Sequence, residues 1–317
     1  MRLYDIATAY LNSLNSFPLV LFYQYQNVQN PRSSSCNLCF HPPFYLFSIA
    51  VHECKHSQSS HSAQTNTTQY RQRSPRYCNQ LDQVETAFND ALELASYVLS
   101  AIDKDTTIYP NYFADEDRAN VKAVYSAIIG QTIVPENPST GNDLLGKILV
   151  QTTDTENKCD DQTLAYTNDG DTEKPYIVLC PNAFKKKAVT SLKGAENPAD
   201  NPNDAAHYIQ CLDFEADGGH VSYKMNSLGA TLLHEYTHDD NLVKSIFSAS
   251  IIDQTDGYGP VNVYNKLDKG LAKLNADSYI YYASEVLWSE LCGNTFQAPR
   301  ALIDDSDPDC GGSTCKP

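Results

Sequence analysis

The sequence contains no run of about 18 apolar residues, the length that a membrane-spanning helix requires. Basic residues are also scarce, because 23 lysines and arginines stand against 39 aspartates and glutamates, for a formal net charge of −16. The acidity argues against a nucleic acid partner, whose phosphates would be repelled. We therefore expect no membrane span and no nucleic acid, and an acidic protein that can attract basic substrates.

A clear secretion signal is missing as well. Residues 19–23 and 44–51 are apolar, but neither stretch follows a basic start and ends at a small-residue cleavage site. Cysteine, in contrast, is abundant, and ten cysteines indicate an oxidising compartment. Asn66-Thr67-Thr68 also matches the acceptor pattern for N-glycosylation. On the cysteines above all, we predict a secreted, extracellular protein.

Composition divides the chain into three regions. Residues 1–75 combine aromatic clusters with a polar stretch, which predicts a leader, a propeptide or a disordered segment. Residues 76–292 have the periodicity of a folded domain, and residues 293–317 form an acidic tail that we expect to be irregular. Cys36 and Cys39, followed by His52, Cys54 and His56, are interpreted as stray residues, because the last pair is too closely spaced for a zinc finger.

Within the central region, apolar periodicity predicts helices over residues 81–102, 116–129, 261–271 and 276–291. Strands are expected over residues 147–152, 175–180 and 220–225, with an irregular interval at 239–260. Cys159 and Cys180 bracket an acidic loop at 160–174, so we predict a disulfide that closes it. The expected fold class is α+β, mostly helical with a small sheet.

One motif carries chemistry: Leu232-Leu233-His234-Glu235-Tyr236-Thr237-His238. Two histidines four residues apart on a helix project from the same face, where their imidazoles can share a zinc ion. Glu235, next to the first histidine, is placed to act as a base on water at that ion. We predict that Ser227 caps this helix and that Leu228, Leu232 and Leu233 form its buried face.

A catalytic zinc site needs a third protein ligand. No histidine follows His238, so the third-histidine pattern is excluded. The later carboxylates that could serve are Glu285, Glu290, Asp239, Asp240, Asp253, Asp256, Asp268 and Asp277.

The motif and two later stretches together resemble the aspzincin metallopeptidases, which include deuterolysins and lysine-specific endopeptidases. The later stretches are Asp253-Gln254-Thr255-Asp256-Gly257-Tyr258-Gly259 and Asn275-Ala276-Asp277-Ser278-Tyr279. That family combines H-E-x-x-H with an aspartate in a G-T-x-x-D-x-x-Y-G loop and a helix start like N-A-D-S-Y. The resemblance covers about residues 80–292 and implies a zincin-like metallopeptidase domain with a zinc cofactor.

This chain departs from the family pattern at the third ligand. The Gly-Thr pair is missing, and Thr255 stands three residues before Tyr258, where the family has aspartate. Asp256 is slightly favoured as the ligand because it lies closer to that position, and Asp253 is kept nearly level with it. By resemblance, Tyr258 would donate to the oxyanion and Asp277 would accept a hydrogen bond that orients a ligand or the loop.

The predicted function is a secreted zinc metalloendopeptidase that hydrolyses internal peptide bonds of a protein or peptide substrate. The resemblance implies a preference for basic residues near the cleaved bond, which Asp239 and Asp240 could supply. The alternative is a secreted zinc-binding or surface-interaction protein with a peptidase-like fold and no turnover. A weaker alternative is a host-interaction effector in which the N-terminal segment matters most.

Overall fold

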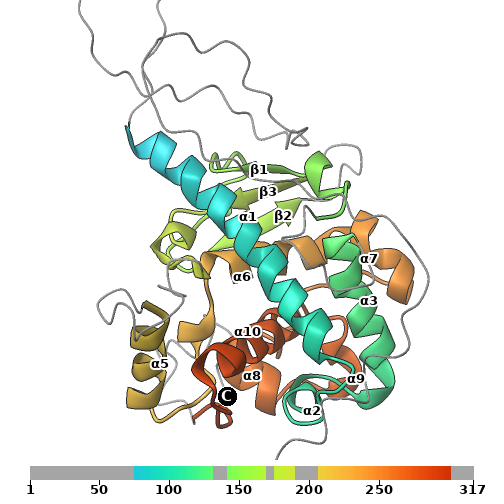
Figure 1. Cartoon of the computed structure of the whole chain (residues 1–317). Coiled ribbons are helices and arrows are strands. Elements are labelled where there is room, and N and C mark those ends of the chain that lie inside the picture. Colours follow the sequence, from blue (N-terminus) through green and yellow to red (C-terminus); the bar gives the residue numbers. More distant parts are fainter. Residues whose placement is uncertain (1–74, 131–140, 169–174, 190–205, 301–317) are drawn as a thin grey trace, which may run out of the picture. The chain divides into compact units, whose positions relative to one another are not determined.

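The computed structural model describes residues 75–130, 141–168, 175–189 and 206–300, all within one compact unit. This part of the chain is α+β and mostly helical, as predicted, with one three-stranded sheet (Figure 1). No helix in the described ranges is long and apolar enough to cross a membrane. The predicted N-terminal segment, its cysteine and histidine cluster, Asn66 and residues 301–317 lie outside the described residues.

The helices with the clearest apolar periodicity form close to where they were predicted. Residues 81–101 of the predicted 81–102 lie in α1, 116–129 lie mostly in α3, and 276–291 lie in α10. Shorter helices complete the described set, whose bounds are α1 (Pro75–Ala101), α2 (Tyr109–Tyr112), α3 (Arg118–Ile129), α5 (Ala206–Ala216), α6 (Leu228–His238), α7 (Asp240–Phe247), α8 (Gly259–Asn265), α9 (Lys269–Ala272) and α10 (Ala276–Cys292).

The sheet has the strand order β1 (Leu149–Gln151), β3 (Tyr176–Leu179), β2 (Ala165–Asn168). β1 pairs with β3 in parallel and β2 pairs with β3 antiparallel, so β3 is central and largely buried. β1 and β3 were predicted, whereas β2 lies inside the expected acidic loop. The disulfide Cys159–Cys180 is present, as predicted, and ties the start of this loop to the end of β3.

Three expectations are corrected by the fold. Residues 220–225 form no strand: a bridge joins His220 to Gln297, and Tyr223–Met225 make a 3₁₀ turn. Val221 and Met225 are the apolar residues of this stretch, and both are buried in a small core around Trp288 rather than on a sheet. The interval 239–260 contains α7, which Asp239 caps by accepting from the Asn241 amide. The helix expected at 261–271 is divided into α8 and α9.

The small core also fixes the start of the C-terminal tail. Phe296 is buried against Phe214, and residues Gly219 to Val221 exchange main-chain hydrogen bonds with Gln297. The disulfide Cys211–Cys292 links α5 to the end of α10 beside these contacts. The first residues of the predicted tail are therefore part of the packed structure, although they lack a helix or strand.

Helix α6 packs between the sheet and α10, with α1 running across it (Figure 1). All three leucines predicted to be buried on α6 are buried, and the Ala230 amide donates to the predicted cap, Ser227. The approach to α1 is close at Gly229, where an added Cβ would lie 2.3 Å from Cβ of Asp90. The absence of a side chain at Gly229 therefore sets how near α1 and α6 can lie.

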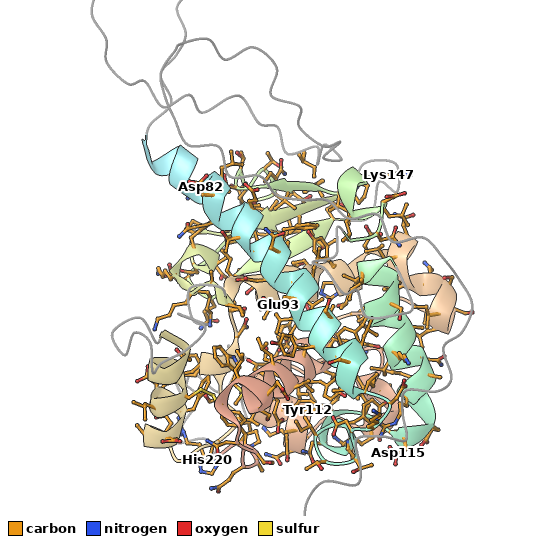
Figure 2. The ribbon with its side chains drawn as sticks, viewed as in Figure 1. Asp82, Glu93, Tyr112, Asp115, Lys147 and His220 are labelled. Carbon is orange, nitrogen blue, oxygen red and sulfur yellow. A yellow bond between two sulfur atoms is a disulfide. The ribbon has the colours of Figure 1, made fainter. Side chains whose placement is uncertain are left out.

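A buried carboxyl group lies on α10, far from the motif helix in sequence. Glu285 is 1% exposed, and its Oε2 accepts a hydrogen bond of 2.7 Å from the hydroxyl of Tyr112, which Figure 2 labels. Burial raises the pKa of Glu285 to about 7, while the Tyr112 bond lowers it and the nearby Asp105 charge raises it. The Glu285 side chain thus links α10 to Tyr112 of α2 in the interior of the protein.

We expect Gly229→Ala to destabilise the fold, because the new methyl group overpacks the contact with α1. The free energy of unfolding, measured in urea, should fall by about 1–3 kcal/mol. Alanine normally stabilises a helix relative to glycine, so the sign of the change is informative. Gly146→Ala is the matched control, since nothing lies within 4 Å of an added Cβ there. Equal stability of the two variants would contradict the close α1–α6 contact.

Glu285 should make the folded state less stable as the pH rises from about 4.5 to 7. In the unfolded chain the Glu285 carboxyl group has its ordinary pKa of 4.5 and loses its proton in this interval. In the folded chain the same group keeps its proton up to about pH 7. The loss amounts to about 3 kcal/mol at pH 7.5 and is absent below pH 4.5.

The measurement is urea unfolding of the wild type and Glu285→Gln between pH 4 and pH 7.5, with chelator present throughout. The variant should become more stable relative to the wild type as the pH rises. Glu290→Gln, which changes an exposed carboxylate on the same helix, should follow the wild type. Parallel curves for Glu285→Gln and the wild type would contradict the prediction.

Candidate metal centre and its supports

The two histidines of the motif are the partly exposed residues of the otherwise buried helix α6. Nine of the eleven residues of α6 are buried, and the remaining two are His234 and His238. Their side chains are 12% and 17% exposed, and their rings lie 4.8 Å apart at the centroids. Both imidazoles therefore face the same partly accessible space, as their spacing of four residues predicts.

Asp253 completes a group of three possible metal ligands. Its Oδ1 lies 3.1 Å from Nε2 of His234 and 3.5 Å from Nε2 of His238. These three residues are the group among the described histidines, cysteines and acids whose ligand atoms lie within 4.8 Å of one another. Oδ1 of Asp253 is buried and accepts no hydrogen bond from any described group. The atom is therefore directed at the two ring nitrogens.

The other nitrogen of each histidine is already engaged. Nδ1 of His238 lies 2.9 Å from the carbonyl oxygen of Ile251, and Nδ1 of His234 lies 2.8 Å from Oδ1 of Asp277. Because both partners accept hydrogen bonds, each neutral imidazole carries its proton on Nδ1. Both Nε2 lone pairs are left to bind a metal ion, which is the usual arrangement around ligating histidines.

The backbone on both sides of Asp253 is attached to the start of α10. The Ile252 amide donates to the carbonyl of Leu274, and the Ile252 carbonyl accepts from the Ala276 amide. The Gln254 amide donates to the side chain of Asn275, whose amide group in turn donates to the Gly257 carbonyl. Asp253 is thereby fixed between two anchored neighbours.

The slight preference for Asp256 as third ligand is corrected by this geometry. Asp256 is exposed and lies in a turn closed by a hydrogen bond from the Gly257 amide to the Gln254 carbonyl. The turn absorbs the extra residues before Tyr258, and the exposed Asp256 is not part of the three-residue group. The sequence distance to the tyrosine was therefore a poor guide to which aspartate faces the histidines.

Asp277 holds a histidine and the loop with one carboxylate. While Oδ1 contacts His234, Oδ2 accepts a hydrogen bond of 2.7 Å from the amide of Gly259. Asp277 is 7% exposed, and it sits in the first turn of α10, where a negative charge is favoured by the helix dipole. The resemblance implied either a ligand or the loop as its partner, and Asp277 contacts both His234, a candidate ligand, and Gly259 of the loop.

Tyr258 lies beside the group rather than apart from it. Its hydroxyl donates a hydrogen bond of 2.6 Å to Oδ2 of Asp253, the oxygen that does not face the histidines. Burial and the Asp253 charge raise the pKa of Tyr258 far above its ordinary value, so the hydroxyl keeps its proton. The tyrosine therefore orients Asp253 in this structure and remains a hydrogen-bond donor.

Glu235 lies on α6 beside His234 and is only 4% exposed. Its Oε2 accepts a hydrogen bond of 2.7 Å from Oγ1 of Thr167, a residue of the edge strand β2. Sequence reasoning missed Thr167 because β2 itself was taken for a loop. It also gave Asn275 no role, although that residue heads the Asn275–Tyr279 stretch.

The charges of the group reinforce one another. Burial lowers the pKa of His234, but the neighbouring carboxylates of Asp253 and Asp277 raise it more, so it lies well above its ordinary value. The pKa of His238 is raised for a similar reason, chiefly by Asp253 against the effect of burial. Burial raises the pKa of Asp253, yet the two histidines hold it well below its ordinary value. Asp253 is therefore a carboxylate, as a metal ligand must be.

The remaining predicted candidates lie elsewhere. Asp239 is 1% exposed and caps α7, and Asp240 is paired at 2.5 Å with Lys244. The suggestion that these two aspartates bind basic substrate side chains is therefore not supported. Glu285 is engaged with Tyr112, and Glu290, Asp239, Asp240 and Asp268 do not belong to the three-residue group.

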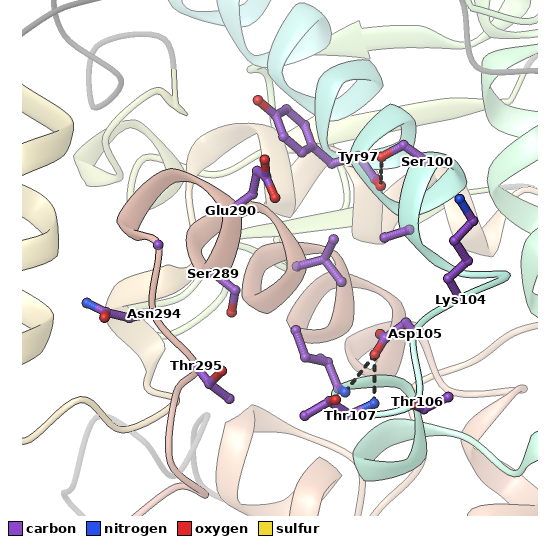
Figure 3. Close-up of a pocket in the computed structure, with 14 residues that line it drawn as sticks. Tyr97, Ser100, Lys104, Asp105, Thr106, Thr107, Ser289, Glu290, Asn294 and Thr295 are labelled. Atoms are coloured by element: carbon purple, nitrogen blue, oxygen red, sulfur yellow. Dashed lines mark hydrogen bonds between the residues drawn. The ribbon is translucent and has the colours of Figure 1, made fainter. Parts of the chain in front are cut away.

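A separate cleft of about 670 Å³ opens between the C-terminal turns of α1 and α10 (Figure 3). It is lined largely by polar side chains, among them Ser100, Lys104, Asp105 and Glu290. None of the described residues that line it belongs to the group around Asp253. The candidate metal centre is thus distinct from this cleft.

Removal of Asp253 should impair metal binding much more than removal of Asp256. We expect Asp253→Ala to weaken zinc binding by more than about 100-fold, and Asp277→Asn by about 10- to 100-fold through the loss of His234 orientation. Asp256→Ala is the matched control and should bind zinc as the wild type does. Competition against a chromophoric chelator measures all four proteins. Comparable losses in Asp253→Ala and Asp256→Ala would contradict the assignment.

Comparison with known proteins assigns no family to this arrangement. No protein-family model matches the chain, and no curated protein is significantly similar to it. The interpretation of the site therefore depends on its residues and on their geometry.

Proposed function

We propose that this chain is a zinc-dependent endopeptidase with a zincin-like fold, related to the aspzincins. One observation carries the proposal: two Nε2 atoms and one buried carboxylate oxygen converge, while the other nitrogen of each histidine is held elsewhere. Glu235 lies next in sequence to one of these histidines. A pure metal-binding site would not need a buried glutamate at that position.

The donor set fits zinc. Two imidazole nitrogens and one carboxylate oxygen are the three protein ligands of a catalytic zinc site, which leaves a fourth position open. Oδ1 of Asp253 supports this fit, because it is a buried carboxylate oxygen that faces both Nε2 atoms. A bound zinc ion would polarise the scissile carbonyl and lower the pKa of water at the site.

Glu235 is assigned the role of general base and acid. It accepts a proton from the attacking water and passes that proton to the amine that leaves, so that the peptide bond is replaced by a carboxylate and an amine. Its burial favours proton transfer to substrate over exchange with bulk water. His234, His238 and Asp253 keep their protonation states through the reaction.

Tyr258 is assigned the stabilisation of the oxyanion. Its hydroxyl is protonated and lies at the group, but it is bonded to Asp253 in the absence of substrate. To stabilise the oxyanion, the Tyr258 hydroxyl must give up its hydrogen bond to Oδ2 of Asp253 and donate to the negatively charged oxygen of the substrate instead. Hydrogen bonds of this kind commonly rearrange when the substrate binds.

The strand β2 offers a place for an extended substrate. Among the described strands it pairs with β3 alone, so it lies at one edge of the sheet, and it packs against α6 near Glu235. An extended peptide adds to such an edge through main-chain hydrogen bonds. The two disulfides support the further proposal that the protein works outside the cell, in an oxidising compartment.

The decisive measurement is cleavage of casein by the purified protein with and without 1,10-phenanthroline. Activity should disappear with the chelator and return with added zinc. Glu235→Gln should keep one zinc per chain and lose activity by at least about 100-fold. Glu85→Gln, the same change on an exposed position of α1, should leave activity unchanged.

Zinc bound at one per chain without chelator-sensitive cleavage would contradict the peptidase and support the non-catalytic alternative. The predicted preference for basic residues is tested in the same assay with lysine-containing and alanine-containing peptides of one sequence. Equal rates would refute the preference while leaving the peptidase intact.

A further inference from the structure

Thr167 stands where the edge strand meets the motif helix. The register pairs it with Ile177 of β3, and β2 packs against α6. Its two neighbours point to the other side, because Tyr166 donates a hydrogen bond of 2.8 Å to Asp154 and Asn168 donates one of 2.9 Å to the hydroxyl of Tyr176. Side chains alternate along a strand, so these anchors turn Thr167 toward α6.

The hydroxyl of Thr167 reaches Glu235 at two atoms. Its Oγ1 lies 2.7 Å from the carboxylate oxygen Oε2 and 3.2 Å from the main-chain oxygen of the same residue. The shorter contact has the distance of a charge-assisted hydrogen bond. A hydroxyl carries one proton, so it donates to Oε2 when the carboxylate is ionised.

We propose that Thr167 is a positioning residue for the general base, an inference that rests on the proposed peptidase function. By holding Oε2, the hydroxyl fixes the rotation of the carboxylate and leaves Oε1 to take the proton of the attacking water. Thr167 gives up no proton in this step. When Glu235 is protonated on Oε1, the Thr167 hydroxyl still has two acceptors, Oε2 and the main-chain oxygen.

The register of the sheet makes this role specific to one residue. A shift of β2 by a single residue would turn Tyr166 or Asn168 toward α6 and remove the short hydroxyl contact. The bonds to Asp154 and Tyr176 oppose such a shift, and the disulfide Cys159–Cys180 spans the strand. The sheet thus places the Thr167 hydroxyl against the Glu235 carboxylate.

The test compares Thr167→Val, which keeps the shape and strand preference but lacks the hydroxyl, with Thr167→Ser, which keeps the hydroxyl. We expect Thr167→Val to lower kcat by about 10- to 100-fold, with KM within about 2-fold of wild type and one zinc still bound. Thr167→Ser should restore most of kcat. Thr163→Val, which removes a hydroxyl bonded to Asp160, is the matched control and should behave as wild type.

Crystal structures of the metal-free proteins give a readout that does not depend on activity. The Glu235 carboxylate should leave its position in Thr167→Val and keep it in Thr167→Ser. An unmoved carboxylate, or an unchanged kcat, in Thr167→Val would overturn the proposal. If the wild type fails to cleave casein, the proposed function fails, and the crystal structures still decide whether Thr167 positions Glu235. Thr167→Ala replaces the valine variant if that protein does not fold.

Discussion

The arrangement of the candidate metal ligands His234, His238 and Asp253 depends on one constraint, the attachment of residues 251–259 to the start of α10. Main-chain bonds join Ile252 to Leu274 and Ala276, and the side chain of Asn275 bonds to Gln254 and Gly257, so the backbone around Asp253 is held on both sides. The contact is so close at Gly257 that an added Cβ would lie 2.3 Å from Oδ1 of Asn275. Asp253, the candidate third ligand, is therefore positioned by residues at the start of α10, although it belongs to a loop.

The charges of His234, Asp253 and Asp277 are compatible with a bound cation. Asp253 and Asp277 approach His234 at its two ring nitrogens; the side chains of His234 and Asp277 are largely removed from water, and that of Asp253 is 29% exposed. Burying a carboxylate costs several kcal/mol unless an opposite charge and hydrogen bonds offset it. In the metal-free protein a protonated histidine supplies part of that charge, which is why the pKa of His234 is raised. A divalent ion between the Nε2 atoms would supply more charge and let both imidazoles be neutral.

Sequence reasoning succeeded where a pattern was local. The cap at Ser227, the buried leucines of α6 and the periodicity of α1 and α10 follow from residues a few positions apart, and the structure contains each of them. It failed where contacts join distant segments. β2 is only four residues long, so Thr167 could not be located without its pairing to β3. The choice between Asp253 and Asp256 likewise depended on main-chain bonds to residues more than twenty positions away.

The loop before Tyr258 differs in spacing from the aspzincin pattern that the sequence resembles. In G-T-x-x-D-x-x-Y-G the tyrosine follows the aspartate by three residues, whereas Tyr258 follows Asp253 by five. The turn at residues 254–257 takes up the difference, and the Tyr258 hydroxyl still reaches Asp253. Asp277 on α10 thus contacts His234, and Thr167 on β2 contacts Glu235, while both elements pack against α6. We therefore expect that a change in the loop can move Asp253 without displacing Glu235, because the hydroxyl contact to Glu235 comes from the sheet.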